Sequence, residues 1–291
     1  MGTKLGQNFL ISKAIARRIA KEAGIEPEDV VLEVGPGKGI LTDALFKYAP
    51  KKIIAIEKDK YLASALKEKY DSFKNVEILE GDVLDYLEED PRPREFKIVA
   101  NIPYYLTSRM LRLIFSSGAP KTLPLKVVLM MQKEVAGRVA AKPPQMSLLS
   151  VSVQVFGKTR VAFRVPKKYF KPKPKVDSAV LLIEDISRDF FTGISEKDFF
   201  YLVKAGFTQK RKFLISNLKN YLWRPDPLSL DSAGFIAPKP NFGDARAGGV
   251  AEIKKTDLEE IFKECGVSLK ARAQDVSIDN WKNLLYHLSQ R

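Results

Sequence analysis

The chain has 291 residues, 45 % of them hydrophobic and 29 % charged, which is enough apolar material for one or two packed domains. An excess of 49 Lys and Arg over 35 Asp and Glu gives a formal net charge of +14, which favours a polyanionic partner. No apolar run reaches the roughly 18 residues of a membrane-spanning helix. One cysteine and one histidine are too few for a disulfide framework or a Cys/His zinc site. We expect a basic, cytoplasmic protein with no metal and no membrane association.

The first part of the chain alternates strand-like with helix-like segments. Short runs rich in Val and Ile predict strands at residues 30–34, 52–57, 76–80, 97–101, 125–131, 159–165 and 178–184. Apolar residues at three- and four-residue spacing predict helices at 40–48, 60–70 and 107–115. Residues 147–156 are ambiguous, because their composition favours a strand but their position could hold a helix. This alternation predicts an α/β fold with about seven strands in a mostly parallel sheet that is covered on both faces.

The pattern changes after residue 186. Amphipathic helices are expected at 195–205, 210–222, 255–265 and 278–288, with Ser195 and Ser277 as N-caps. Residues 223–251 are rich in Pro, Gly, Ala and Asp without periodicity, and they predict a long loop insertion. We therefore expect an α/β domain over 1–186 and a smaller all-α domain over 187–291.

A glycine-rich turn and two acidic strand ends indicate a nucleoside cofactor. Gly35 and Gly37 follow the first expected strand directly, where glycine allows a close approach of the backbone to a ligand. Glu57 ends the second strand and can accept both hydroxyls of a ribose, and Asp82 ends the third and can bind an adenine amino group. The alternative is a glycine turn without ligand between two solvated strand ends. Three neighbouring strand ends that all carry ligand-type residues favour the cofactor site.

The fourth of these strands ends in Asn101, Ile102, Pro103 and Tyr104, which favour chemistry on a planar amine. Pro103 biases Ile102 to an extended conformation and so fixes the direction of its carbonyl. The Asn101 side chain offers a second carbonyl acceptor, and Tyr104 offers a ring for stacking. Two acceptors that bind both N–H groups of an amine such as adenine N6 favour a pyramidal, nucleophilic nitrogen. The alternative is a proline-stiffened loop with a core tyrosine.

The motif at 101–104 resembles the Asn/Asp-Pro-Pro-Tyr signature of amino-methyltransferases. Taken with the stretches 5–10, 132–138 and 170–179, the chain resembles the KsgA-type ribosomal RNA adenine dimethyltransferases over most of its length. The resemblance implies a Rossmann-like class I methyltransferase domain. It also implies methyl transfer from S-adenosylmethionine to N6 of two adjacent adenines in a 3′-terminal hairpin loop of small-subunit rRNA during ribosome assembly.

The resemblance also implies roles for individual residues. Asn101, Ile102, Pro103 and Tyr104 would hold the target base, with Phe170 closing over its other face. The cofactor-binding set would be Gln7, Asn8, Leu10, Gly35, Gly37, Glu57 on the ribose, Lys58, Asp82 on the adenine, Val83 and Asn101.

Two basic clusters are expected to bind RNA. Lysines alternate with aromatic residues at 165–175, and a second cluster stands at 210–212, where it is expected to open a helix. For either cluster the alternative is a solvated surface. The expected RNA-binding residues are Lys167, Lys168, Lys171, Lys173, Lys210, Arg211 and Lys212.

Two other functions stay open at this point. One is a large-subunit rRNA adenine methyltransferase of the antibiotic-resistance type, and the other is a non-catalytic nucleic-acid-binding factor on the same fold. The motifs at 132–138 and 208–212 favour the small-subunit family. We expect a monomer that acts on rRNA or on an immature small subunit.

Overall fold

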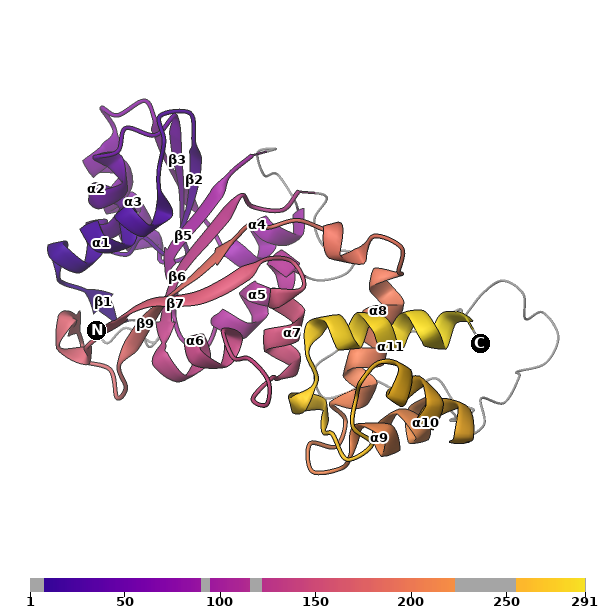
Figure 1. Ribbon diagram of the computed structural model, residues 1–291. Coiled ribbons are helices and arrows are strands. Elements are labelled where there is room, and N and C mark those ends of the chain that lie inside the picture. Colours follow the sequence, from indigo (N-terminus) through magenta and orange to yellow (C-terminus); the bar gives the residue numbers. More distant parts are fainter. Residues whose placement is uncertain (1–7, 90–94, 116–121, 223–254, 291) are drawn as a thin grey trace. The chain divides into compact units, whose positions relative to one another are not determined.

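The computed structural model describes residues 8–89, 95–115, 122–222 and 255–290 (Figure 1). Two compact units make up the chain, one from residues 1–140 and 156–187, the other from 141–155 and 188–291. The chain passes from the first unit to the second for the last time after residue 187, one residue from the boundary expected after residue 186. A linear division nevertheless misses residues 141–155, which join the second unit.

The first unit is built on a seven-stranded sheet with the order β4-β3-β2-β5-β6-β9-β7. Strands β4 to β6 run parallel, whereas β9 is antiparallel to β6, and β7 is antiparallel to β9. This confirms the expected α/β, mostly parallel sheet. The strands are β2 (Val30–Val34), β3 (Lys52–Glu57), β4 (Val76–Glu80), β5 (Lys97–Asn101), β6 (Lys126–Gln132), β7 (Lys158–Val165) and β9 (Ser178–Glu184).

The sheet forms because its central strands are apolar on both faces. Ile98, Val99 and Ala100 of β5 are all fully buried, as expected where helices cover both sides of a parallel sheet. One face packs against a core shared with α1, α2 and α3. The helices of this unit are α1 (Lys13–Ala23), α2 (Ile40–Phe46), α3 (Lys60–Tyr70), α4 (Val83–Glu89), α5 (Thr107–Phe115) and α6 (Lys133–Val139).

A separate two-stranded ladder joins the N-terminal segment to a later hairpin. In this ladder β1 (Phe9–Leu10) pairs antiparallel with β8 (Phe170–Lys171), so that Leu10 lies opposite Phe170. A further hydrogen bond runs from the Ile11 N–H to the Tyr169 carbonyl at 2.9 Å. Segments about 160 residues apart are therefore hydrogen-bonded to each other beside the carboxyl ends of the parallel strands.

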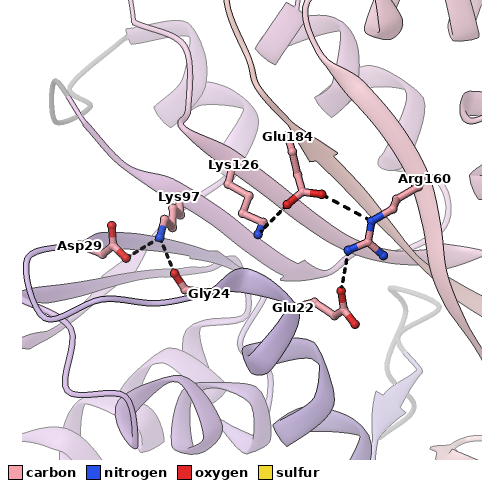
Figure 2. Close-up of polar contacts among 7 residues, drawn as sticks. All are labelled: Glu22, Gly24, Asp29, Lys97, Lys126, Arg160 and Glu184. Atoms are coloured by element: carbon pink, nitrogen blue, oxygen red, sulfur yellow. Dashed lines mark hydrogen bonds and ion pairs between the residues drawn. The ribbon is translucent and has the colours of Figure 1, made fainter.

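Ion pairs fix α1 on the opposite end of the sheet (Figure 2). At the start of β5, Lys97 donates to the Asp29 carboxylate and to the Gly24 carbonyl, each at 2.6 Å. Both charged side chains are only 12 % exposed, so this pair is screened less than a surface pair. Gly24 caps the C-terminus of α1 in a left-handed conformation. Helix α1 therefore ends at the amino end of β5 and begins toward its carboxyl end.

A second set of ion pairs in Figure 2 ties α1 to the antiparallel edge of the sheet. Arg160 on β7 pairs with Glu22 of α1 at 3.0 Å and with Glu184 of β9 at 3.5 Å. Glu184 also pairs with Lys126 at the start of β6, at 2.8 Å. One helix and three strands thus share a single charge network.

The second unit is helical, as expected. It contains α7 (Leu148–Gln154), α8 (Glu196–Gly206), α9 (Leu214–Leu222), α10 (Lys255–Glu264) and α11 (Ile278–Gln290). The ambiguous stretch 147–156 is helical because Ser147 and Ser150 form a reciprocal capping box, and because α7 packs on α8. The Ser195 and Ser277 hydroxyls accept from the backbone three residues on, which confirms both N-caps. The insertion expected at 223–251 lies outside the described residues.

One expected helix start is wrong. Residues 210–212 form an exposed turn, closed by a 3.0 Å bond from the Lys212 N–H to the Gln209 carbonyl, and α9 begins only at Leu214. Leu214 is the first fully buried residue of this segment. Residues 209–212 are all polar, so they offer no apolar side chain for burial and do not extend the helix.

Candidate active site

A cavity of about 340 Å³ opens at the carboxyl ends of β2, β3, β4 and β5, and every residue that lines it belongs to the first unit. Open parallel sheets bind ligands at this edge. The lining includes the expected Asn8, Leu10, Gly35, Gly37, Glu57, Lys58, Asp82, Val83, Asn101, Ile102, Pro103, Tyr104 and Phe170. The expected Gln7 lies outside the described residues.

The glycine-rich turn between β2 and α2 forms the floor of the cavity. Gly35 and Gly37 have φ values of 64° and 59°, a left-handed region that other residues adopt at a cost. A Cβ atom on Gly37 would lie 3.1 Å from the ring of Phe9. The N-terminal segment therefore closes directly over this turn.

Glu57 organises the turn from the end of β3. Its carboxylate is buried and accepts the N–H groups of Gly37 and Asp59, each at 2.9 Å. An ionised carboxylate offers about four acceptor positions, so at least one remains on each oxygen for a ligand hydroxyl. The same side chain thus holds the loop and faces the cavity.

Asp82 follows β4 and is fixed as an anion. Lys58 donates to one of its oxygens at 2.8 Å, and the Leu84 N–H donates to the other at 2.9 Å. Although burial opposes it, these two hydrogen bonds and the Lys58 charge hold the pKa of Asp82 below its usual value. The pairing with Asp82 likewise raises the pKa of Lys58. Asp82 is therefore an ionised acceptor on the wall of the cavity.

The loop after β5 presents two carbonyl acceptors. The Ile102 N–H continues the sheet ladder to the Met130 carbonyl at 3.0 Å, which sets the direction of the next peptide. The Asn101 amide nitrogen lies 3.4 Å from the Asn8 carbonyl. Because the nitrogen of the amide is committed to Asn8, its oxygen is the part available to a ligand.

Two aromatic rings stand beside these acceptors. The Tyr104 hydroxyl lies 2.9 Å from the hydroxyl of Ser178, the buried first residue of β9. Phe170, on the β8 strand that pairs with β1, is only 4 % exposed and lines the same cavity. The residues expected to hold a base are thus brought together with those expected to hold a cofactor.

Glu33 is a functional candidate that the sequence analysis did not single out. It lines the cavity but is only 1 % exposed, and its carboxylate oxygens have no hydrogen-bond partner among the described residues. Burial raises the pKa of Glu33 to about 8, an effect that the nearby Thr42 hydroxyl reduces. A buried carboxyl of this kind is suited to a cationic ligand group. Its place near the end of β2, two residues before Gly35, was the available signal.

Other cavity residues were also missed. Phe9 covers Gly37, and Tyr105 stands at the rim with 63 % of its surface exposed. Lys38 and Arg109 add positive charge to the lining. These residues reach the cavity from chain segments that meet only in the folded protein.

The expected RNA-binding lysines do not line the cavity. Lys168, Lys171 and Lys173 are exposed on the segment around Phe170, and Lys167 is half-buried there. Lys210, Arg211 and Lys212 are exposed on the second unit. Both clusters are therefore surface features.

No group of three potential metal ligands occurs in the described ranges. None of the helices described is long and apolar enough to cross a bilayer.

The strand order, the glycine turn and the acidic strand ends define a Rossmann-like methyltransferase domain. The family model for ribosomal RNA adenine dimethylase matches residues 1–256. The chain belongs to this family and is a methyltransferase.

Individual relatives agree with this assignment. The ribosomal RNA small subunit methyltransferase A of Dehalococcoides mccartyi is 38 % identical over 265 residues, which cover 90 % of this chain and 89 % of the relative. The protein of the same name from Enterococcus faecalis is 40 % identical over 225 residues, 75 % of each chain. Among solved structures, a dimethyladenosine transferase from Plasmodium falciparum matches with a TM-score of 0.77 and 26 % identity, covering 97 % of this chain and 98 % of that one. The 23S rRNA methyltransferase ErmE matches with a TM-score of 0.72 and 25 % identity, covering 97 % and 99 %.

Proposed function

We propose that this protein transfers methyl groups from S-adenosylmethionine to N6 of two adjacent adenines in a 3′-terminal hairpin loop of small-subunit rRNA during ribosome assembly. The observation that carries the proposal is one cavity in which the acceptors at Asn101 and Ile102 face the same space as Glu57 and Asp82. The relatives named small subunit methyltransferase A support the choice of RNA.

The lining of the cavity fits S-adenosylmethionine. The buried carboxyl of Glu33, which lacks a partner among the described residues, suits the positive charge on the methionine part of the molecule. Glu57 keeps acceptor positions for ribose hydroxyls, and the ionised Asp82 can accept from an adenine amino group. When bound, the cofactor supplies an electrophilic methyl group.

The amine of the target adenine is held by carbonyl oxygens. The Asn101 side-chain oxygen and the Ile102 backbone oxygen accept its two N–H groups, which concentrates the nitrogen lone pair on the side away from them. Tyr104 stacks on one face of the base and Phe170 covers the other, so that water is kept from the reacting nitrogen.

No strong base is needed in this arrangement. Alkylation makes the nitrogen acidic, and its proton leaves along the hydrogen bond to one of the two carbonyl oxygens and passes to solvent. The one histidine of the chain, His287, lies in α11 of the second unit. The residues named above bind, orient and exclude water.

A base in a stacked helix cannot reach such a cavity, so the target adenine has to leave its stack. An unpaired loop lowers the cost of this step. We assign RNA contacts to Lys167, Lys168, Lys171 and Lys173 on the first unit and to Lys210, Arg211 and Lys212 on the second. We also assign cofactor binding to the α/β unit, RNA binding to the helical unit, and action as a monomer in the cytoplasm.

The test is methylation of separated ribosomal subunits. The protein is incubated with radiolabelled S-adenosylmethionine and either small or large subunits that lack the modification, and labelled nucleosides are identified after digestion. Label in N6,N6-dimethyladenosine from the small subunit is the expected result. The likeness to ErmE makes large-subunit RNA the specific alternative, and label found only there would overturn the proposal in its favour. Absence of label with either subunit, while the cofactor binds, would leave a non-catalytic binding factor.

A further inference from the structure

The exposed face of α1 carries four positively charged side chains. Lys13, Arg17 and Lys21 recur at four-residue spacing with Arg18 beside them, and all four side chains are exposed. The helix has no acidic residue in its first turn, and none occurs before Glu22. Its other face carries Ala16, Ile19, Ala20 and Ala23, which are fully buried against the sheet. We call the four exposed cations the α1 surface.

The charge of the α1 surface is not neutralised locally. None of its four cations forms an ion pair with any residue that the structure describes, and Glu22 is committed to Arg160. Other basic residues of this unit, such as Lys97 and Lys126, are paired with carboxylates. The Arg18 guanidinium lies 3.8 Å above the Phe163 ring centre, which fixes its position without removing its charge.

The α1 surface begins at the mouth of the cavity. Leu10 lines the cavity, and the helix starts three residues later at Lys13. The hydrogen bond from Ile11 to Tyr169 holds this start beside the segment that carries Lys168 and Lys171. From Lys13 to Lys21 the helix rises by about 12 Å, which is long enough for its cations to contact several phosphates of one RNA strand.

We propose that the α1 surface binds the sugar-phosphate backbone of the RNA stem next to the loop whose base enters the cavity. This inference rests on the proposed function, because it takes that loop as the substrate. Evenly spaced, unpaired cations on a rigid helix match successive phosphates and carry no sequence information. An anionic membrane is a poorer partner, because α1 buries its apolar face in the protein and has none left to insert.

The test compares two charge-matched triple variants of the full chain. Lys13→Gln, Arg17→Gln and Lys21→Gln remove three cations from the α1 surface and leave Arg18 on Phe163. The control, Lys47→Gln, Lys51→Gln and Lys67→Gln, removes three exposed cations near α2 and α3. Affinity for a synthetic hairpin RNA with two adjacent loop adenines is measured between 50 and 200 mM salt. Melting temperature and affinity for S-adenosylmethionine check that each variant is intact.

Loss of three phosphate contacts predicts a fall of about 2 to 3 in the slope of log affinity against log salt, with affinity reduced roughly 10- to 100-fold at 50 mM salt. The control variant should keep the wild-type slope. An unchanged slope in the α1 variant, while the wild type binds and methylates the RNA, overturns this inference alone. If the wild type neither binds nor methylates RNA, the proposed function fails as well. Loss of binding to anionic vesicles with RNA binding retained would assign the surface to a membrane instead.

Discussion

The Tyr104 hydroxyl lies 2.9 Å from the Ser178 hydroxyl, although 74 residues separate the two in the chain. Ser178 is fully buried at the start of β9, so it fixes the far end of the tyrosine while the ring lines the cavity. One of two stretches that are separate in sequence, 101–104, thus supplies the tyrosine ring, and the other, 170–179, supplies the hydroxyl that holds it.

Removal of this hydrogen bond should slow catalysis more than it weakens cofactor binding. We expect Tyr104→Phe and Ser178→Ala each to lower kcat about 3- to 10-fold and the free energy of unfolding by about 1 kcal/mol. Affinity for S-adenosylmethionine should stay unchanged. Because both variants break the same bond, the double variant should lose little more than either single one. Additive losses in kcat would show that the two hydroxyls act separately.

Asn101→Ala should abolish most methyl transfer while RNA binding is retained. The variant removes one of the two proposed acceptors for the amine, and we expect a loss in rate like that of removing one preorganised hydrogen-bonding group from a reacting centre, about 10²- to 10³-fold. Single-turnover methylation and RNA affinity are the two measurements. A parallel loss of both would mean that Asn101 mainly supports the fold around Asn8.

Glu57→Gln should weaken cofactor binding and leave RNA binding intact. The substitution replaces a charged acceptor of the Gly37 and Asp59 N–H groups by a neutral amide, in which one oxygen becomes a donor. We expect the Kd for S-adenosylmethionine to rise on the order of 10- to 100-fold, measured by calorimetry. An unchanged Kd would place the ribose elsewhere.

Glu33 should make the stability of the ligand-free protein depend on pH. Its pKa is raised to about 8 in the folded chain from an ordinary value of 4.5, so the unfolded chain releases this proton first. Folding therefore becomes less favourable as pH rises from about 4.5 to about 8. The Glu33→Gln variant lacks this pH dependence, because an amide does not release a proton in this range. The melting temperature of the variant should match the wild type near pH 5 and exceed it by roughly 5–10 °C near pH 8. Equal melting temperatures at both pH values would contradict this account.

Lys210→Glu with Arg211→Glu should weaken RNA affinity and flatten its salt dependence. Both residues lie on an exposed turn, so stability should change by less than about 0.5 kcal/mol. The slope of log affinity against log salt is the measurement. A wild-type slope would remove this turn from the RNA interface.

Most of the sheet could be predicted because its strands are defined by local composition. Residues 30–34, 52–57, 76–80 and 97–101 begin and end as expected, since each is a short run with Val, Leu or Ile at its centre between polar turns. The cavity residues at the ends of these strands could be predicted from the same strand assignments, because parallel strands place their carboxyl ends at one edge of the sheet.

What could not be predicted depends on contacts between distant segments. Residues 147–156 favour a strand by composition, yet packing against α8 and the Ser147 cap make them a helix of the second unit. The two-residue strands β1 and β8 are too short to carry any periodicity. The position of Phe9 on Gly37 and the isolation of Glu33 likewise exist only after folding.

In the proposed function, the ladder of β1 and β8 forms a wall that the cofactor and the target base share. Phe9 rests on the glycine turn that we assign to the cofactor, while Leu10, the next residue, lies opposite Phe170, which we assign to the target base. Two adjacent residues of one strand, Phe9 and Leu10, therefore line both sides of the cavity. A change that shifts this short ladder should therefore disturb the proposed sites of the methyl donor and of its acceptor together.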